Sequence, residues 1–506
     1  MNWKSFRRRW VIPLVLIGIM VVASLVIISV YLEPNNFLPT KEDAEVPSSV
    51  VPSTNVTNPP TLPAENASVT GKRWNKTFGG AFDTRANSVR QTSDGGYIVT
   101  GYVDYPLTVP KNRNGTQIIG TQTISQYNVY LLKTDAYGSL VWNKSFGGLS
   151  TSNCPGYDNV LCALNWNKSS GGLSTAIGNS ARQTSDGGYI VVGKYQSAKL
   201  HNRTYDFDYN DLDYDTGSEV YLIKTDANGN MQWDKTFSGE YYDEIGYDVQ
   251  QTSDGGYFIV GTTNSYRVCK KCANPLLRFP NDIYLIKTDA NGNNVWNKTI
   301  GDIYIDSEPT VQQTSDGGYI AVGAAASFVD TGAVDVYLLK IDANGNKSWE
   351  KTVSRNGEAG FLSISVQQTS DGGYITGLIE ETNLTGRVKH LIKTDSSGNI
   401  QWDKTFKLED NKSFIYSDQQ TSDGGYITVG FTPSAQVYLT KTDAYENKIW
   451  ERILRGDTGT YSVQQTSDGG YVISTGTYID KAFWRTGSGY PRFNIYLIKT
   501  DANGNV

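Results

Sequence analysis

Thr92-Ser-Asp-Gly-Gly-Tyr97 is the first of seven copies of one hexapeptide, and this repeat decides the fold. The other copies begin at Thr184, Thr252, Thr314, Thr369, Thr421 and Thr466. A Lys-x-Asp motif follows each copy, and in six units a Trp stands seven residues after its Asp. Regular repetition of one unit is the sequence signature of propellers and solenoids.

Each unit contains four short segments separated by turn signals. They resemble Ser-Val-Gln-Gln-Thr, Tyr-Ile-Val-Val-Gly, Val-Tyr-Leu-Ile-Lys-Thr-Asp and Val-Trp-Asn-Lys-Thr-Phe, with Asp-Gly-Gly and Asp-Ala-Asn-Gly turns between them. Glycine accepts the positive φ that tight hairpin turns need. The two middle segments are apolar at nearly every position, which is typical of strands covered on both faces. We therefore predict an all-β fold over 72–506, a seven-bladed β-propeller of four-stranded blades.

The two ends of the repeat array are offset by one strand. Residues 74–80, WNKTFGG, match a fourth strand without the three that should precede it, and the last unit ends without its Trp. We expect residues 72–78 to pair with the strand that ends near Lys499. Such pairing closes the ring and removes its open sheet edges.

The Lys-Thr-Asp-Ala-Asn-Gly-Asn-x-x-Trp pattern resembles the repeats of secreted prokaryotic β-propeller proteins and is similar to the PQQ-type propeller repeat. The resemblance covers 72–506 and implies the architecture. These families include enzymes and assembly scaffolds, so it implies no single activity. PQQ enzymes typically have eight blades, whereas the repeat count here is seven. We therefore expect no organic cofactor, and the blade-two connection described below suggests calcium.

The N-terminal 71 residues have three distinct compositions. Residues 1–10 are basic, residues 11–32 are an uncharged apolar run, and residues 33–71 are rich in Pro, Ser, Thr and Asn. A helix over 11–32 spans roughly 33 Å, enough to cross a bilayer. The basic flank predicts a cytoplasmic N-terminus, a single-pass signal anchor, a linker, and an extracellular propeller. A cleaved signal peptide is the alternative.

Composition narrows the classes of function. The net charge is −6, from 45 basic and 51 acidic residues, so no broad basic surface for nucleic acid is expected. The two histidines leave little material for histidine-based metal sites or a Ser/His/Asp triad.

Cysteines and glycosylation sequons fit an extracellular setting. Cys154 and Cys162 share one insertion, and Cys269 and Cys272 form a C-x-x-C in another. Two local disulfides are predicted, and a zinc site made of all four is the alternative. Sequons that point to glycosylation stand at Asn55, Asn66, Asn114, Asn202, Asn383 and Asn411.

Long connections between second and third strands are the predicted binding surface, because variable loops on a rigid scaffold commonly carry binding. The candidate ligand-binding residues are aromatic, in blades two and seven: Tyr205, Phe207, Tyr209, Tyr214, Phe483, Trp484 and Tyr490. The blade-two connection also carries candidate calcium ligands: Asp211, Asp213, Asp215 and Glu219. The alternative for this last group is a solvated acidic loop.

Two arginines interrupt a column of glutamines on the first strands, which are expected to line the central channel. Arg90 and Arg182 stand where the other five units have Gln. One hypothesis is an anion site near the axis. The favoured alternative is a hydrogen-bonded glutamine ring with two solvated arginines.

Together these features predict a membrane-anchored cell-surface module that binds or scaffolds envelope proteins or glycans through its loop face. The alternative is an extracytoplasmic propeller enzyme, either a quinoprotein-like dehydrogenase or a carbohydrate-active enzyme, which needs clustered carboxylates or a cofactor pocket near the axis.

Overall fold

The computed structural model describes residues 72–80, 82–112, 118–147, 174–197, 217–239, 243–264, 281–300, 304–305, 309–326, 334–353, 361–369, 371–382, 386–407, 414–432, 434, 436–445, 447–456, 458–479 and 492–506. The predicted cytoplasmic segment, anchor and linker lie outside these residues. Within them, no helix has the length and apolar character needed to cross a membrane.

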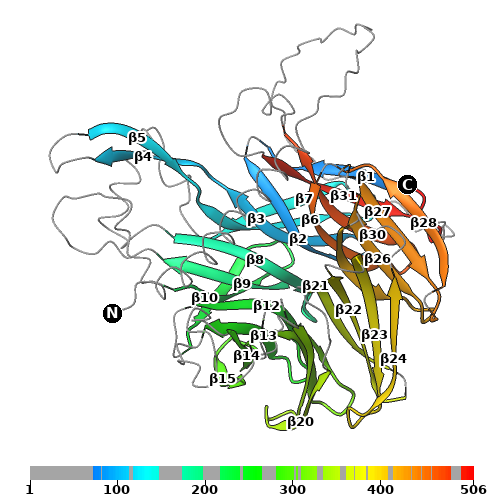
Figure 1. Ribbon diagram of the computed structural model, residues 1–506. Coiled ribbons are helices and arrows are strands. Elements are labelled where there is room, and N and C mark those ends of the chain that lie inside the picture. Colours follow the sequence, from blue (N-terminus) through cyan, green and yellow to red (C-terminus); the bar gives the residue numbers. More distant parts are fainter. Residues whose placement is uncertain are drawn as a thin grey trace, which may run out of the picture. The chain divides into compact units, whose positions relative to one another are not determined.

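Seven antiparallel sheets form the blades of the described part of the chain (Figure 1). Six of them have four strands, and the sheet of blade four has five because its first strand is split. Blade one contains β2 (Asp83–Gln91), β3 (Tyr97–Asp104), β6 (Tyr127–Thr134) and β7 (Leu140–Phe146). Blade two contains β8 (Ser174–Gln183), β9 (Tyr189–Ser197), β10 (Glu219–Thr225) and β11 (Met231–Phe237). Blade three contains β12 (Glu244–Gln251), β13 (Tyr257–Asn264), β14 (Asn281–Thr288) and β15 (Asn294–Ile300).

The remaining blades repeat this order. Blade four contains β16 (Tyr304–Ile305), β17 (Thr310–Gln313), β18 (Tyr319–Ala326), β19 (Val334–Ile341) and β20 (Lys347–Val353). Blade five contains β21 (Phe361–Gln368), β22 (Tyr374–Thr382), β23 (Gly386–Thr394) and β24 (Ile400–Lys407). Blade six contains β25 (Phe414–Gln420), β26 (Tyr426–Phe431), β27 (Val437–Thr442) and β28 (Lys448–Leu454). Blade seven contains β29 (Thr458–Gln465), β30 (Tyr471–Tyr478) and β31 (Phe493–Thr500).

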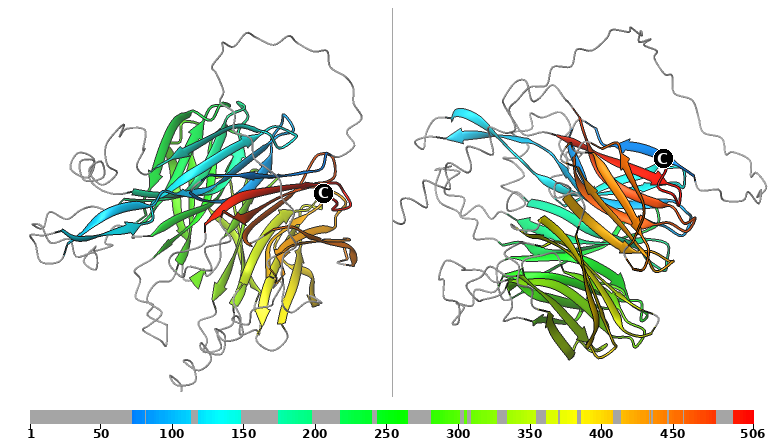
Figure 2. Two further views of the ribbon diagram at one scale, coloured as in Figure 1. Left: turned by 90° about the horizontal axis from the view of Figure 1, so that it is seen from above. Right: turned by 45° about the vertical axis from the view of Figure 1, so that its right-hand side comes forward.

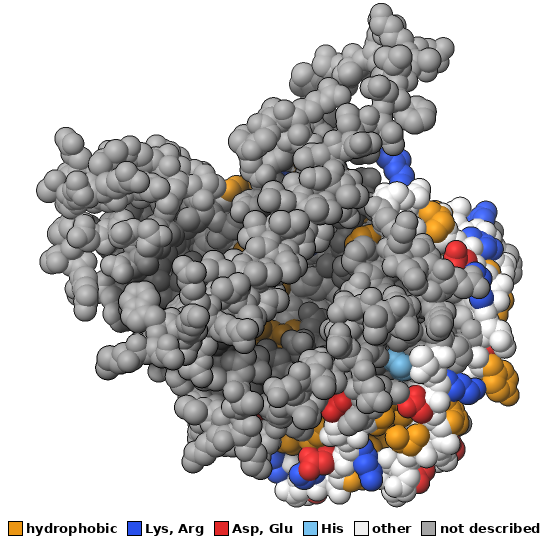
Figure 3. Space-filling view, in the orientation of Figure 1, with side chains coloured by type: hydrophobic (Ala, Val, Ile, Leu, Met, Phe, Trp, Pro, Cys, Tyr) orange, Lys and Arg blue, Asp and Glu red, His pale blue; other side chains and the backbone are white. Residues whose placement is uncertain are grey.

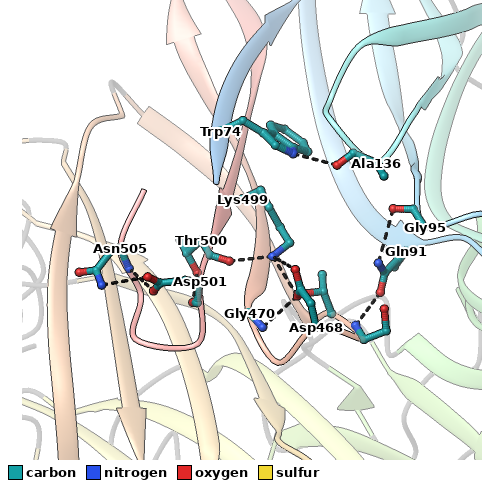
Figure 4. Close-up of polar contacts among 12 residues, drawn as sticks. Trp74, Gln91, Gly95, Ala136, Asp468, Gly470, Lys499, Thr500, Asp501 and Asn505 are labelled. Atoms are coloured by element: carbon teal, nitrogen blue, oxygen red, sulfur yellow. Dashed lines mark hydrogen bonds and ion pairs between the residues drawn. The ribbon is translucent and has the colours of Figure 1, made fainter. Parts of the chain in front are cut away.

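The N-terminal strand β1 (Trp74–Phe78) completes blade seven, which confirms the predicted closure. It pairs antiparallel with β31, so that Trp74 stands opposite Lys499 and Phe78 opposite Ile495. The Trp74 indole also donates a hydrogen bond to the Ala136 carbonyl of blade one, at 3.1 Å (Figure 4). The first and last segments of the propeller are therefore joined in one sheet.

The hydrophobic core consists of separate layers between neighbouring blades. One layer joins Ile190 and Leu222 of blade two to Val249 and Ile286 of blade three. The fourth-strand Trp of one blade also packs on the next blade; Trp142, for example, meets the Tyr189 ring edge-on at 5.6 Å. Since each sheet is covered on both faces by its neighbours, its two middle strands are apolar at nearly every position.

Two local features depart from the regular blade. The first strand of blade four is split into β16 and β17, and Pro309, which cannot donate to a ladder, stands before β17. Blade one carries an additional two-stranded ribbon, β4 (Leu107–Asn112) and β5 (Ile118–Ile124), between β3 and β6. The ribbon extends away from the blades in all three views (Figures 1 and 2).

Candidate functional site

The first strands of the blades form the inner wall of the ring. Each contacts the first strand of the next blade, and β29 contacts β2. In five blades these strands end in Gln-Gln, directly before the Thr-Ser-Asp-Gly-Gly turn. The two glutamines therefore lie at the end of the axis where the hairpin turns gather, which we call the turn face. The second-to-third-strand connections lie at the opposite end, the loop face.

Glutamine side chains link neighbouring blades around this wall. The first Gln of the pair accepts a hydrogen bond from the backbone N–H of the following blade's second Gln. This bond joins Gln464 to Gln91 (2.6 Å), Gln250 to Gln313 (2.9 Å), Gln312 to Gln368 (2.5 Å) and Gln419 to Gln465 (2.8 Å). At these junctions the structure shows the expected hydrogen-bonded glutamine ring.

The structure places Arg182 of blade two in an ion pair with blade three. Its Nη2 lies 2.9 Å from Oδ2 of Asp248 and 3.2 Å from Oδ1. Ser180 Oγ donates a further bond to the same carboxylate, at 2.8 Å. Asp248 occupies a position where the other six blades have Ser or Thr. One exchange, Gln to Arg, is thus matched by another, Ser or Thr to Asp, in the next blade.

Arg90 occupies the equivalent position in blade one, but it has no such partner among the described residues. Its Nε is buried, and no acceptor for it is found in the part of the chain that the structure describes. Burial, followed by the charge of Arg182, lowers the pKa of Arg90 to about 10, while the Asp248 carboxylate acts in the opposite direction. Neither arginine is the freely solvated side chain that the favoured sequence interpretation expected.

Buried lysines tie the repeat's two motifs together, a feature that the sequence analysis missed. In every blade the Lys of Lys-x-Asp forms an ion pair with the Asp of the same blade's Thr-Ser-Asp-Gly-Gly turn. In blade seven, Lys499 Nζ lies 2.9 Å from Asp468 Oδ2 and donates to the Thr500 carbonyl at 2.7 Å (Figure 4). The sequence did contain a signal for this ion pair, because a lysine recurs in the otherwise apolar third strand of all seven blades.

The same ion pair explains the Gly-Gly dipeptide. In blade one, Gly95 has a φ of +78°, in the left-handed region where glycine is favoured. A Cβ on Gly96 would lie 2.2 Å from the Thr134 carbonyl oxygen and 2.5 Å from Lys133 Nζ. The first glycine is needed for the turn, and the second leaves room for the lysine.

Asp-Ala-Asn-Gly turns are held by hydrogen bonds to their own aspartates, which is typical of Asp in turns. Asp226 Oδ1 accepts bonds from the N–H groups of Asn228 and Asn230, at 2.9 and 2.8 Å. In blade six, which lacks the glycine, Asp443 accepts the equivalent bond from Asn447 at 2.8 Å. These hydrogen bonds account for the turn motif.

On the loop face, Glu244 is a buried carboxyl between blades two and three. Its side chain accepts a hydrogen bond from Thr263 Oγ1 at 2.9 Å. Burial raises the pKa of Glu244 to about 7 despite that bond, and the charges of Asp243 and Glu219 add to the rise. Because Glu244 is only 1% exposed, its position favours a role in joining strands over direct contact with a ligand.

Most of the predicted site residues lie outside the described part of the chain. These are the candidate ligand-binding aromatics, Asp211, Asp213 and Asp215, the four cysteines and the six sequons. Glu219 is described, and its carboxylate accepts a bond from Ser238 Oγ at 2.6 Å. The calcium, disulfide and glycosylation assignments remain predictions.

The described surface carries mixed charge. On the face shown in Figure 3, basic, acidic and apolar side chains are interspersed. The chain's formal net charge of −6 is correspondingly small for 506 residues.

Comparisons with known proteins leave the family open. No protein-family model and no curated protein matches the chain. Among solved structures, a protein of unknown function from Dyadobacter fermentans is 11% identical, with a TM-score of 0.43 over 63% of this chain and 93% of its own. BBS1N in complex with ARL6DN is 12% identical, with a TM-score of 0.41 over 85% and 97%. CoXyl43, a GH43 β-xylosidase/α-arabinofuranosidase from a compost metagenome, is 12% identical, with a TM-score of 0.29 over 51% and 92%.

Proposed function

We propose that this chain is a membrane-anchored cell-surface module whose protein or glycan partner binds the loop face. The β4–β5 ribbon of blade one is the observation that carries the proposal (Figures 1 and 2). Extended two-stranded ribbons that project from a closed scaffold supply backbone and side-chain groups for recognition without disturbing the core. The turn face, by contrast, carries the same two short turns in every blade.

The ribbon has a stem that is shared by connections of very different length. Tyr105 N donates to the Gln126 carbonyl at 2.8 Å, and this bond closes the base of the ribbon. In blade six the same bond runs from Thr432 to Gln436 at 2.8 Å and encloses only a short turn. The second-to-third-strand connection enclosed by this bond can therefore be exchanged while the four strands of the blade are kept.

Blade six supplies the matched variant for a test of the loop face. Residues 105–125 are replaced by the sequence of 432–435, Thr-Pro-Ser-Ala, and Gln126 is kept as the counterpart of Gln436. Gln126 Nε2 donates to the Ser174 carbonyl at 3.0 Å, so the contact with blade two is retained. We expect an unchanged melting temperature and at least a tenfold loss of affinity for partners captured by the parent chain on glycan arrays or by cross-linking.

Two outcomes would contradict the proposal. One is a parent chain that captures no protein or glycan from its own cell envelope. The other is a folded variant that keeps full affinity while substitutions on the turn face abolish it. Either result would move the binding surface away from the long connections.

Membrane anchorage is a separate part of the proposal and rests on the apolar run 11–32 with its basic flank. We expect the full chain to remain in the membrane pellet after alkaline carbonate and to be released by detergent. Protease added to intact cells should digest the propeller. Release by carbonate alone would contradict a spanning anchor.

A further inference from the structure

We propose that the turn-face end of the axis is a binding site for a small oxyanion, phosphate or carboxylate, held between Arg90 and Arg182. The site lies at the opposite end of the ring from the proposed partner-binding face, so it is independent of the function proposed above. Four observations carry it: guanidinium Nε–H groups without acceptors among the described residues, backbone N–H groups without acceptors there, the local charge, and the repeat itself.

The first observation is an excess of side-chain donors. A guanidinium has five N–H groups and no acceptor. Arg182 uses Nη2 for Asp248, but its Nε is buried without an acceptor, as is the Nε of Arg90, among the residues that the structure describes. A buried unpaired donor costs free energy, so these groups favour a ligand that supplies oxygen atoms.

The second observation concerns the backbone. Thr92 N–H bonds to the Gly96 carbonyl at the end of the β2–β3 ladder, so by antiparallel alternation the N–H of Gln91 points away from β3. There it bonds to the Gln464 amide oxygen. In blades two and three the equivalent N–H groups belong to Gln183 and Gln251, and the preceding blade has an arginine, which cannot accept, at the position of the accepting Gln. These two donors also remain for a ligand, since no side-chain acceptor for them occurs within the described ranges.

The third observation is the charge balance. Two arginines face one carboxylate, Asp248, which leaves a local charge of +1 in a wall whose other equivalent positions are neutral glutamines. Arg182 and Asp248 both act on the pKa of Arg90, so the three groups lie close enough to form one electrostatic unit. A monovalent oxyanion neutralises it. The planar guanidinium fork also matches the paired oxygens of phosphate and carboxylate.

The fourth observation is that the repeat provides its own control. Gln at the Arg90 position is the residue of five other blades, and in four of them its amide accepts the next blade's N–H. Arg90→Gln should therefore restore the bond to Gln183 N–H. The ligand-free variant is expected to fold with a melting temperature at or above that of the parent chain. Loss of anion binding in such a variant is separable from damage to the fold.

The experiment measures the melting temperature of the full chain against inorganic phosphate from 0 to 20 mM, at constant ionic strength set with sodium chloride. For a Kd of about 1 mM we expect a rise of about 2 °C. Acetate in a parallel series distinguishes carboxylate from phosphate. Isothermal titration calorimetry gives the affinity directly.

Three variants complete the design. Arg90→Gln should lose the response, as should Arg182→Gln combined with Asp248→Ser, which restores the repeat at both positions. Arg452→Gln, on the outer strand β28, removes one positive charge away from the axis and should respond like the parent chain. The proposal is overturned if the parent chain responds to neither phosphate nor acetate, or if Arg90→Gln responds as the parent does.

Discussion

Removal of the carboxylate charge in blade seven should cost far more stability than the same change in blade three. In both blades a buried lysine meets the turn aspartate, but the carboxylates differ in exposure. The side chain of Asp468 is 10% exposed and that of its partner Lys499 is 1% exposed. The side chain of Asp254 is 63% exposed, beside a Lys287 side chain that is 7% exposed. Asp468→Asn and Asp254→Asn are therefore a matched pair.

The expected magnitudes follow from this difference. Asparagine can keep the turn hydrogen bond that Gly470 N donates to Asp468 Oδ1, so the substitution removes mainly the charge. An uncompensated buried charge costs about 3–5 kcal/mol. The Asp254 carboxylate is itself exposed to solvent, and screening limits the loss there to about 1 kcal/mol. With an unfolding entropy of about 2.1 cal/mol/K per residue over the unit Ser68–Val506, 1 kcal/mol corresponds to about 1 °C.

Thermal melts of the full chain should show a fall of about 3–5 °C for Asp468→Asn and about 1 °C for Asp254→Asn. Burial already lowers the pKa of Lys499, and loss of its partner lowers it further. The defect of Asp468→Asn should therefore shrink as the pH rises from 7 towards 10 and Lys499 releases its proton. Equal shifts in the two variants, or a defect that does not change with pH, would refute the reasoning.

Three further predictions concern other parts of the ring. Trp74→Ala should lower the melting temperature by about 3–5 °C, because the indole packs edge-on against the Tyr97 ring at 5.5 Å; an unchanged melt would mean that β1 does not close the ring. Glu244 has a folded pKa of about 7, above its ordinary 4.5, so its contribution is full below pH 4.5 and is lost as the pH rises through 7. Glu244→Gln should melt about 3 °C higher than the parent chain at pH 8 and about equally at pH 4.5, whereas a parallel pH dependence in both proteins would exclude this residue as its source. The pKa of Asp94 is about 2, because bonds from Lys133, Thr92 and Gly96 N–H outweigh the effect of burial, so its ion pair stabilises the fold above pH 4 and is lost as the pH falls to 2. Each such exposed pair contributes about 1 kcal/mol, so the melting temperature should fall steeply between pH 5 and pH 2. This fall should be about 1 °C smaller in Lys133→Met, which lacks one of the pairs.

The architecture could be predicted from the sequence because the determining signals are local and repeated. A turn motif fixes each hairpin, and the isolated Trp74-Asn-Lys-Thr-Phe78 segment shows which strand is displaced to the N-terminus. Closure by β1 follows from the count of strands, since an open ring would leave two unpaired edges. No long-range information was needed.

The interactions that cross between motifs were harder to predict. The ion pair between Lys133 and Asp94 joins residues that are 39 positions apart in the sequence, and neither motif by itself indicates that the two are in contact. Asp248 stands out only when the first strands of all seven blades are aligned, because the other six have Ser or Thr at this position, three residues before the final Gln. The β4–β5 ribbon had a local signal that was overlooked, an Asn114-Gly115 dipeptide between segments rich in Thr, Val and Ile.

The placement of β1 in the last blade also sets the order of events during translation. Its partner β31 emerges from the ribosome roughly 400 residues later, which at about 5–20 residues per second is a delay of about 20–80 s. Ala136, which accepts the Trp74 indole bond, follows only 62 residues after Trp74. Blade one can therefore hold the nascent N-terminal strand by its tryptophan while six further blades are made. Trp74 therefore has two roles: it stabilises the closed ring, and it holds β1 against blade one until β31 has been synthesised.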